Sequence, residues 1–153
     1  MALDVMLLRT SFTMVTERSP GLMRRFYEIL FQRYPETVSM FPRGPEGLVK
    51  QENMLTNALA SVLARLEDGP WLQQTLFNMG ARHVKYGVRD EMYGWVGECL
   101  IAALEEAAEP DWSPGLADQW SEAFGVIAGI MLAGAAGARS VATPPREKSN
   151  AVI

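Results

Sequence analysis

The chain has a single histidine, His83, and a single cysteine, Cys99, among its 153 residues. One histidine excludes an HExxH zinc site and every site that needs two imidazole ligands. With only one cysteine beside it, a Cys/His zinc site lacks ligands. The lone cysteine also excludes an internal disulfide framework. Any chemistry that needs an imidazole in this chain must therefore use His83.

Positive charge and long apolar runs are scarce as well. The 14 Lys and Arg residues against 18 Asp and Glu give a formal net charge of −4, so the chain shows no basic footprint for a nucleic acid. The longest apolar run, residues 125–138, is shorter than the ~20 residues of a membrane span. The first apolar stretch contains Asp4 and has no basic flank, unlike a signal peptide. We expect a cytoplasmic protein with neither a nucleic-acid nor a membrane partner.

The apolar residues recur every three or four positions, and no alternating run is long enough to require a strand. Proline, glycine and cap residues divide this pattern into segments. They predict helices at residues 3–17, 20–34, 47–66, 71–86, 91–108 and 114–137, with a short turn at 36–40. The fold class is therefore all-α, with six to seven helices in one domain over residues 1–138. Residues 139–153 have little periodicity and two adjacent prolines, and we predict a mobile tail there.

Three polar side chains fall on the apolar stripes of these helices. Gln51 precedes Leu55 by four positions, Tyr27 lies among inward-facing residues of the segment 20–34, and His83 follows Met79 on its stripe. Burying a polar group costs free energy unless it finds a partner. Taken one by one, each has a structural explanation: an amide that is partly wet near a helix start, a tyrosine bonded to a carbonyl, and a histidine that caps a carbonyl.

The joint spacing of Tyr27, Phe41, Gln51 and His83 resembles the globin family. The matching segments are FYEILF (26–31) with Pro35 and Phe41, which resembles the B helix through the CD corner; MGARHVKYGV (79–88), which resembles the proximal helix; Tyr93 with residues 96–100, which resembles the start of the G helix; and Trp120 with residues 123–126, which resembles the H helix. The similarity spans roughly residues 3–137. It is closest to bacterial single-domain haemoglobins and to the haem domain of flavohaemoglobins.

This resemblance implies a globin fold that holds haem b between the helices at 47–66 and 71–86. His83 would be the metal ligand, bound through a ring nitrogen to the iron. Its other ring N–H needs an acceptor, and the carbonyl of Met79, one helical turn back, is in position to supply it. Further cofactor-binding residues implied by the family are Phe41, Leu55 and Val88 against the porphyrin, and Arg82 at a propionate.

On the opposite face of the haem, the resemblance places Tyr27 and Gln51 together. A phenol and an amide can both donate hydrogen bonds to O₂, whereas neutral CO gains less from them. A hydrogen bond to a charged group contributes ~1.5–3 kcal/mol, which would slow O₂ escape by roughly tenfold to a hundredfold. Since the chain has no second histidine, we expect a five-coordinate or water-bound iron, with Met54 as the one nearby competing side chain.

One departure from the family concerns the proximal side. Flavohaemoglobins place a carboxylate of the H helix against the proximal imidazole, in a network with a tyrosine. Tyr93 matches that tyrosine, but Ala135 stands at the carboxylate position, and residues 123–146 contain no Asp or Glu. A carboxylate partner makes a ligating imidazole more basic. Its absence argues against peroxidase-like chemistry.

The resemblance therefore implies a haem globin that binds O₂ reversibly, and also NO and CO, as a carrier, store or scavenger. The alternative is an enzyme, an NO dioxygenase in which Tyr27 and Gln51 hold O₂ while NO reacts with it to give nitrate. We expect no flavin or nicotinamide domain in the chain, so that cycle would need a reductase in trans. A gas sensor and a globin fold without haem are further alternatives.

Overall fold

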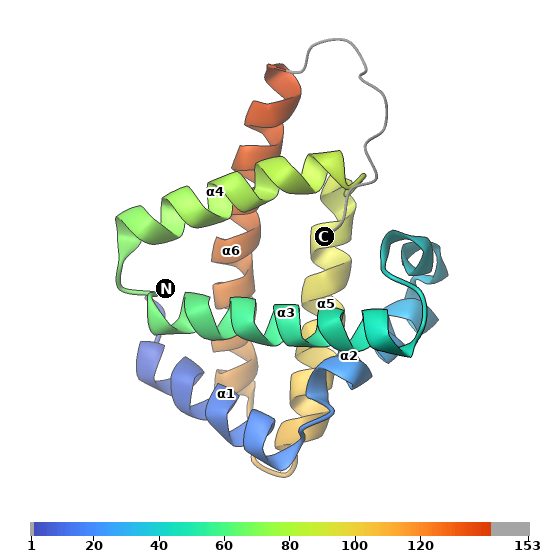
Figure 1. Cartoon of the computed structure of the whole chain (residues 1–153). Coiled ribbons are helices and arrows are strands. Elements are labelled where there is room, and N and C mark those ends of the chain that lie inside the picture. Colours follow the sequence, from blue (N-terminus) through green and yellow to red (C-terminus); the bar gives the residue numbers. More distant parts are fainter. Residues whose placement is uncertain (1, 142–153) are drawn as a thin grey trace.

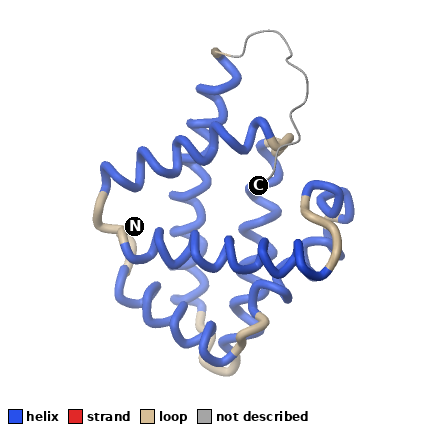
Figure 2. The backbone as a smooth tube through the Cα atoms, viewed as in Figure 1, coloured by secondary structure: helices blue, strands red, loops and turns tan. Residues whose placement is uncertain are grey.

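The computed structural model describes residues 2–141, which form six α-helices and one 3₁₀ helix and include no strand (Figure 1; Figure 2). In chain order these are α1 (Val5–Arg18), α2 (Leu22–Arg33), η1 (Pro35–Met40), α3 (Pro45–Ala64), α4 (Gly69–Lys85), α5 (Asp90–Ala108) and α6 (Pro114–Ser140). The all-α prediction is confirmed. Because α6 continues to Ser140, the first residues of the predicted tail are helical, and residues 142–153 lie outside the described part.

Capping residues set the helix starts. Asp4, Asp68 and Ser113 each accept a hydrogen bond from a backbone N–H in the first turn of α1, α4 and α6, which satisfies a donor that the helix itself leaves open. The predicted start at Ser19-Pro20 is wrong by two residues. The Ser19 N–H donates to the Val15 carbonyl at 2.9 Å, so Ser19 closes α1, and α2 begins at Leu22.

The helices are arranged in two crossing sets around the site (Figure 1). The long helices α5 and α6 pack together behind, while α3 and α4 cross in front of them. The two front helices have different neighbours, because α4 packs against α6 whereas α3 packs against α1 and α2. They are therefore held apart from each other, with side chains of both lining the space between them.

The crossing of α4 and α6 depends on two glycines. A Cβ at Gly80 would overlap the backbone of Met131, and a Cβ at Gly134 would overlap the backbone of Phe77. Both glycines are buried. Side chains normally keep helix axes about 8–10 Å apart, so only glycine permits backbone contact at these two positions.

The helix α6 is long and apolar. Its 27 residues include an 18-residue window with a mean hydropathy of 1.5, of which 22% is buried, so by length and composition alone it could cross a membrane. The prediction that no helix is long enough to span a membrane was based on the apolar run at residues 125–138, and α6 is longer than that run. In the structure α6 packs against α1, α4 and α5. Its Trp120 is 2% exposed and donates through Nε1 to the Ser11 hydroxyl at 3.0 Å, so part of the apolar composition serves the core.

Candidate functional site

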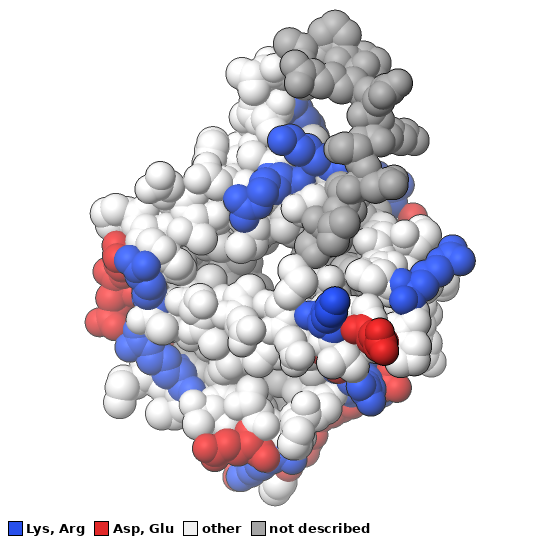
Figure 3. Space-filling view, in the orientation of Figure 1, with Lys and Arg blue, Asp and Glu red and all other residues white. Residues whose placement is uncertain are grey.

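A cavity of about 230 Å³ lies between α3 and α4, and α2, η1, α5 and α6 close its other sides. Most of the side chains that line it are apolar. Its polar side chains are Tyr27, Thr37, Gln51, His83 and Tyr93, and no Asp, Glu, Lys or Arg of the described chain lines it. The surface is hollowed between α3 and α4 (Figure 3). Such an apolar cavity with a few convergent polar groups is the usual form of a small-molecule site.

His83 projects from the last turn of α4 into this cavity. Its Nδ1 lies 2.6 Å from the carbonyl oxygen of Met79. A carbonyl can only accept, so Nδ1 carries the proton and donates it, and Nε2 keeps a lone pair. Burial lowers the pKa of His83, partly opposed by the hydrogen bond to Met79, and the nearby Arg82 lowers it further. The neutral imidazole therefore keeps the lone pair of Nε2 available, and that nitrogen could bind a metal.

Tyr27 and Gln51 come from α2 and α3 and both line the cavity. Tyr27 is 2% exposed and Gln51 is 6% exposed, so the explanation of Gln51 as a partly wet residue is wrong. Burial raises the pKa of Tyr27 to about 12, while a hydrogen bond from the Gln51 side chain acts in the opposite direction. The phenol therefore stays protonated over the physiological range and keeps its ability to donate.

The remaining apolar residues predicted for the site also line the cavity, and they are Phe41, Leu55, Met79 and Val88. Phe41 follows η1, and its ring meets that of Tyr27 edge-on at a centroid distance of 5.3 Å. Arg82 does not line the cavity. It precedes His83 by one position, and one residue turns a helix by roughly 100°, so its side chain leaves the helix in another direction.

Tyr93 lines the cavity from the first turn of α5, and its ring centroid lies 6.5 Å from that of His83. Its hydroxyl is buried and has no hydrogen-bond partner within residues 2–141. The position predicted to lack a carboxylate, Ala135, is 1% exposed in α6. His83 thus has one hydrogen-bond partner among the described residues, the carbonyl of Met79.

Sequence reasoning missed much of the lining. Thr37 is 4% exposed in η1 and donates to the Tyr34 carbonyl at 2.7 Å, and no sequence pattern distinguishes it. The lining from α5 had a signal, because Met92, Val96 and Leu100 repeat at intervals of four. Met54, named as a competitor for the iron, is 47% exposed and does not line the cavity.

The Arg and Lys side chains of residues 2–141 fall into two groups, those that form an ion pair and those that do not. The paired ones are Arg9, Arg18, Arg24, Arg25, Arg33, Arg65, Arg89 and Arg139, each with an Asp or Glu. The others form no ion pair with any described residue, and they are Arg43, Lys50, Arg82 and Lys85. Lys50 belongs to α3, whereas Arg82 and Lys85 belong to the last turn of α4. Blue side chains accordingly lie over both helices beside the hollow (Figure 3).

Residues 24–131 match the model of the family described as Globin, and this range includes most of α2, all of η1, α3, α4 and α5, most of α6 and the whole cavity lining. The chain belongs to the globin family. Among curated relatives, this globin is 28% identical over 127 residues to a flavohemoprotein of Bacillus thuringiensis subsp. konkukian, covering 82% of this chain and 31% of the relative. A flavohemoprotein of Bacillus cereus is 27% identical over 132 residues, covering 86% and 32%. This globin spans about a third of the length of these relatives.

Two solved structures share its fold. One is an engineered carbene transferase obtained from a protein assigned as a nitric oxide dioxygenase of Rhodothermus marinus, with a TM-score of 0.77, 28% identity and coverage of 92% of this chain and 98% of that one. The other is a bacterial globin of Campylobacter jejuni, with a TM-score of 0.76, 24% identity and coverage of 89% and 96%. The globin fold prediction is confirmed, and the family and its flavohemoprotein relatives imply a haem cofactor.

Proposed function

We propose that this globin binds haem b in the cavity between α3 and α4, with His83 as the iron ligand and a diatomic gas, chiefly O₂, held on the opposite side by Tyr27 and Gln51. One observation carries the proposal. The same apolar cavity is lined by a neutral imidazole with a free Nε2 and by two buried hydrogen-bond donors from other helices. When bound, the haem would supply the iron on which a gas is held.

The residues present fit a haem. The cavity lining is apolar as a porphyrin requires, and the lone pair on Nε2 of His83 is the donor that ferrous iron takes. Propionates carry negative charge, and the unpaired cations of α4, Arg82 and Lys85, lie on a helix that flanks the cavity. The unpartnered Tyr93 hydroxyl is a further polar atom available on the His83 side.

The first test is the visible spectrum of the purified chain with haemin added. We expect the parent chain to give a ferrous-CO Soret band and His83→Ala to lose it, with recovery when free imidazole is added to fill the space. Gln74→Ala, an exposed position on the same helix, is the matched control and should keep the band. An unchanged band in His83→Ala without imidazole would contradict the assignment.

The second test is the rate of O₂ dissociation. Tyr27→Phe and Gln51→Leu each remove a hydrogen bond to a partly charged ligand, a contribution of ~1.5–3 kcal/mol. We expect each to release O₂ roughly tenfold to a hundredfold faster. Thr56→Ala, on α3 but outside the cavity lining, is the control. Parent-like rates in both variants would remove this pair from the gas site.

A second candidate function is favoured by the similarity to the Rhodothermus marinus structure, whose parent protein is described as a nitric oxide dioxygenase. In that reaction NO, O₂ and one electron give nitrate, so a reductase must supply the electron. Here Tyr27 and Gln51 would stabilise the charge that develops on oxygen. Sustained nitrate formation with a reductase, without loss of haem, would establish this enzyme activity. A single turnover followed by arrest would leave a gas carrier.

A further inference from the structure

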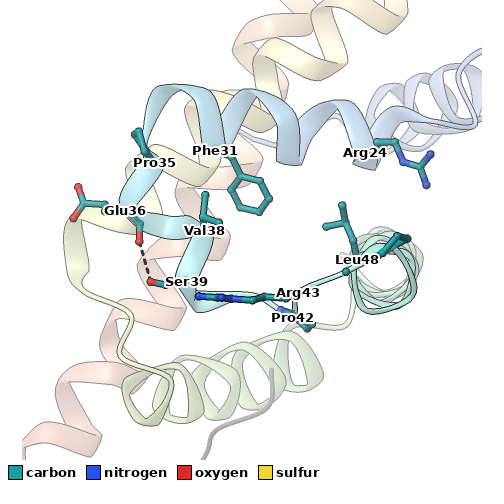
Figure 4. Close-up of a pocket in the computed structure, with 11 residues that line it drawn as sticks. Arg24, Phe31, Pro35, Glu36, Val38, Ser39, Pro42, Arg43 and Leu48 are labelled. Atoms are coloured by element: carbon teal, nitrogen blue, oxygen red, sulfur yellow. Dashed lines mark hydrogen bonds between the residues drawn. The ribbon is translucent and has the colours of Figure 1, made fainter.

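A second cavity opens on the outside of the corner between η1 and α3, and it shares no lining residue with the inner cavity (Figure 4). We refer to it as the corner cleft. It is open to solvent and has a volume of about 690 Å³, within the roughly 300–1,000 Å³ of small-molecule sites. The ring of Phe31 and the side chains of Val38 and Leu48 give it apolar walls, and Val38 is 46% exposed there.

The charged side chains of the corner cleft do not balance one another. Arg24 is paired with Glu52 at 3.3 Å, and Glu36 is paired with Arg89 at 2.9 Å. Arg43 has no ion-pair or hydrogen-bond partner among the described residues. Its side chain runs along one wall of the cleft toward Ser39, beside the apolar surface (Figure 4). One guanidinium group is therefore uncompensated next to an apolar surface.

We propose that the corner cleft binds a small amphipathic monocarboxylate, with its aliphatic chain against Phe31, Val38 and Leu48 and its carboxylate on the guanidinium of Arg43. A guanidinium presents a planar fork of donors that fits the two oxygens of a carboxylate. One unpaired cation matches one negative charge. The apolar walls distinguish such a ligand from an inorganic anion, because they gain free energy only by covering apolar surface.

The corner cleft lies directly behind the aromatic side of the gas site. The Phe31 ring lines the cleft, and its centroid lies 5.8 Å from the rings of both Tyr27 and Phe41, which line the inner cavity. Phe31 thus stands between the corner cleft and the aromatic rings that line the inner cavity. The aliphatic chain of a ligand in the cleft would therefore touch Phe31 on the side away from Tyr27.

The test is a calorimetric titration of the full chain with octanoate. We expect saturable binding at one site, and binding about 10-fold to 100-fold weaker in Arg43→Gln, the effect of losing one hydrogen bond to a charged group. Lys50→Gln is the matched control, since Lys50 is also an unpaired cation of this region but does not line the cleft. It should bind octanoate like the parent chain. Val38→Asp, which puts a negative charge on the apolar wall, should also weaken binding.

Two other probes test the ligand class. Octan-1-ol has the same chain without the charge, so its weaker binding should not change in Arg43→Gln. Inorganic phosphate has the charge without the chain and should bind far more weakly than octanoate. Binding of octanoate that is absent, that is unchanged in Arg43→Gln, or that is matched by phosphate would overturn the proposal. So would an equal loss in Lys50→Gln.

This inference stands independently of the haem. Because the corner cleft shares no lining residue with the inner cavity, His83→Ala should retain octanoate binding even after it loses the Soret band. Failure of the haem assignment and failure of the carboxylate assignment therefore give different results in the same set of proteins.

Discussion

The two helices that flank the inner cavity are fixed by different means. The helix α4, which carries His83, touches α6 backbone to backbone at Gly80 and Gly134. The helix α3 packs against α1 and α2, and its polar contribution to the cavity lining is Gln51, which forms a hydrogen bond with Tyr27 of α2. One wall of the cavity is thus set by backbone contact and the other by a pair of polar side chains.

This difference matters because the wall from α4 would hold the metal ligand, whereas the wall from α2 and α3 would hold the gas. A metal ligand must keep its position within a fraction of an ångström, and a backbone crossing without side chains allows little adjustment. Hydrogen bonds to a gas ligand can be changed one side chain at a time without rebuilding helix packing. We therefore expect substitutions at the α4–α6 crossing to damage the fold, and substitutions at Tyr27 and Gln51 to change gas binding at smaller cost in stability.

The largest effect should come from the glycines of the crossing. Gly80→Ala and Gly134→Ala each place a Cβ inside the backbone of the opposite helix, and overpacking of this kind destabilises a protein by about 3 kcal/mol. Gly125→Ala is the matched control, because this glycine of α6 is exposed and has nothing within 4 Å of an added Cβ. It should be stabilising by about 0.5–1 kcal/mol. Chemical denaturation measures all three, and equal stabilities would refute the description of the crossing.

The second effect concerns Tyr27, and it is a pH dependence of the free energy of unfolding. The pKa of Tyr27 rises from 10.0 to about 12 in the folded chain because of burial. A raised pKa means that the stabilisation is complete below pH 10 and is lost as the pH rises toward 12. Two pKa units correspond to about 2–3 kcal/mol. The parent chain should lose that much more stability than Tyr27→Phe between pH 9 and pH 12, and parallel denaturation curves would contradict it.

Much of the fold could be predicted because local chemistry fixes it. Cap residues and apolar periodicity locate the helices, as at Ser113-Pro114, where the prediction and the structure agree. The crossing could not be predicted in this way. Periodicity places Gly80 on the stripe of His83, but it does not reveal that Gly80 meets the backbone of Met131, fifty-one positions further along the chain. Such a contact depends on how two helices dock.

The candidate site likewise contains residues that could be predicted from the sequence and residues that could not. Tyr27, Gln51 and His83 drew attention because a polar residue on an apolar stripe needs a partner, and all three line one cavity. Thr37 lines it too, but it lies in a 3₁₀ helix whose short length gives no periodicity to interpret. The corner cleft was also beyond prediction, because its apolar walls come from α2, η1 and α3, which the chain brings together only on folding.

The smallest effect should be the coupling between the two polar side chains of α2 and α3. In Gln51→Leu the buried Tyr27 hydroxyl loses its partner, and an unsatisfied buried group costs ~1–3 kcal/mol, whereas removing both partners is nearly neutral. The double variant Tyr27→Phe with Gln51→Leu should therefore be more stable than the sum of the single effects by about 1 kcal/mol. Thr56→Ala combined with Tyr27→Phe supplies the additive control, since Thr56 lies on α3 outside the cavity lining and donates to the Glu52 carbonyl. The free energies of unfolding are measured below pH 9 on the haem-free chain. If the effects of Tyr27→Phe and Gln51→Leu add strictly, the two side chains do not interact.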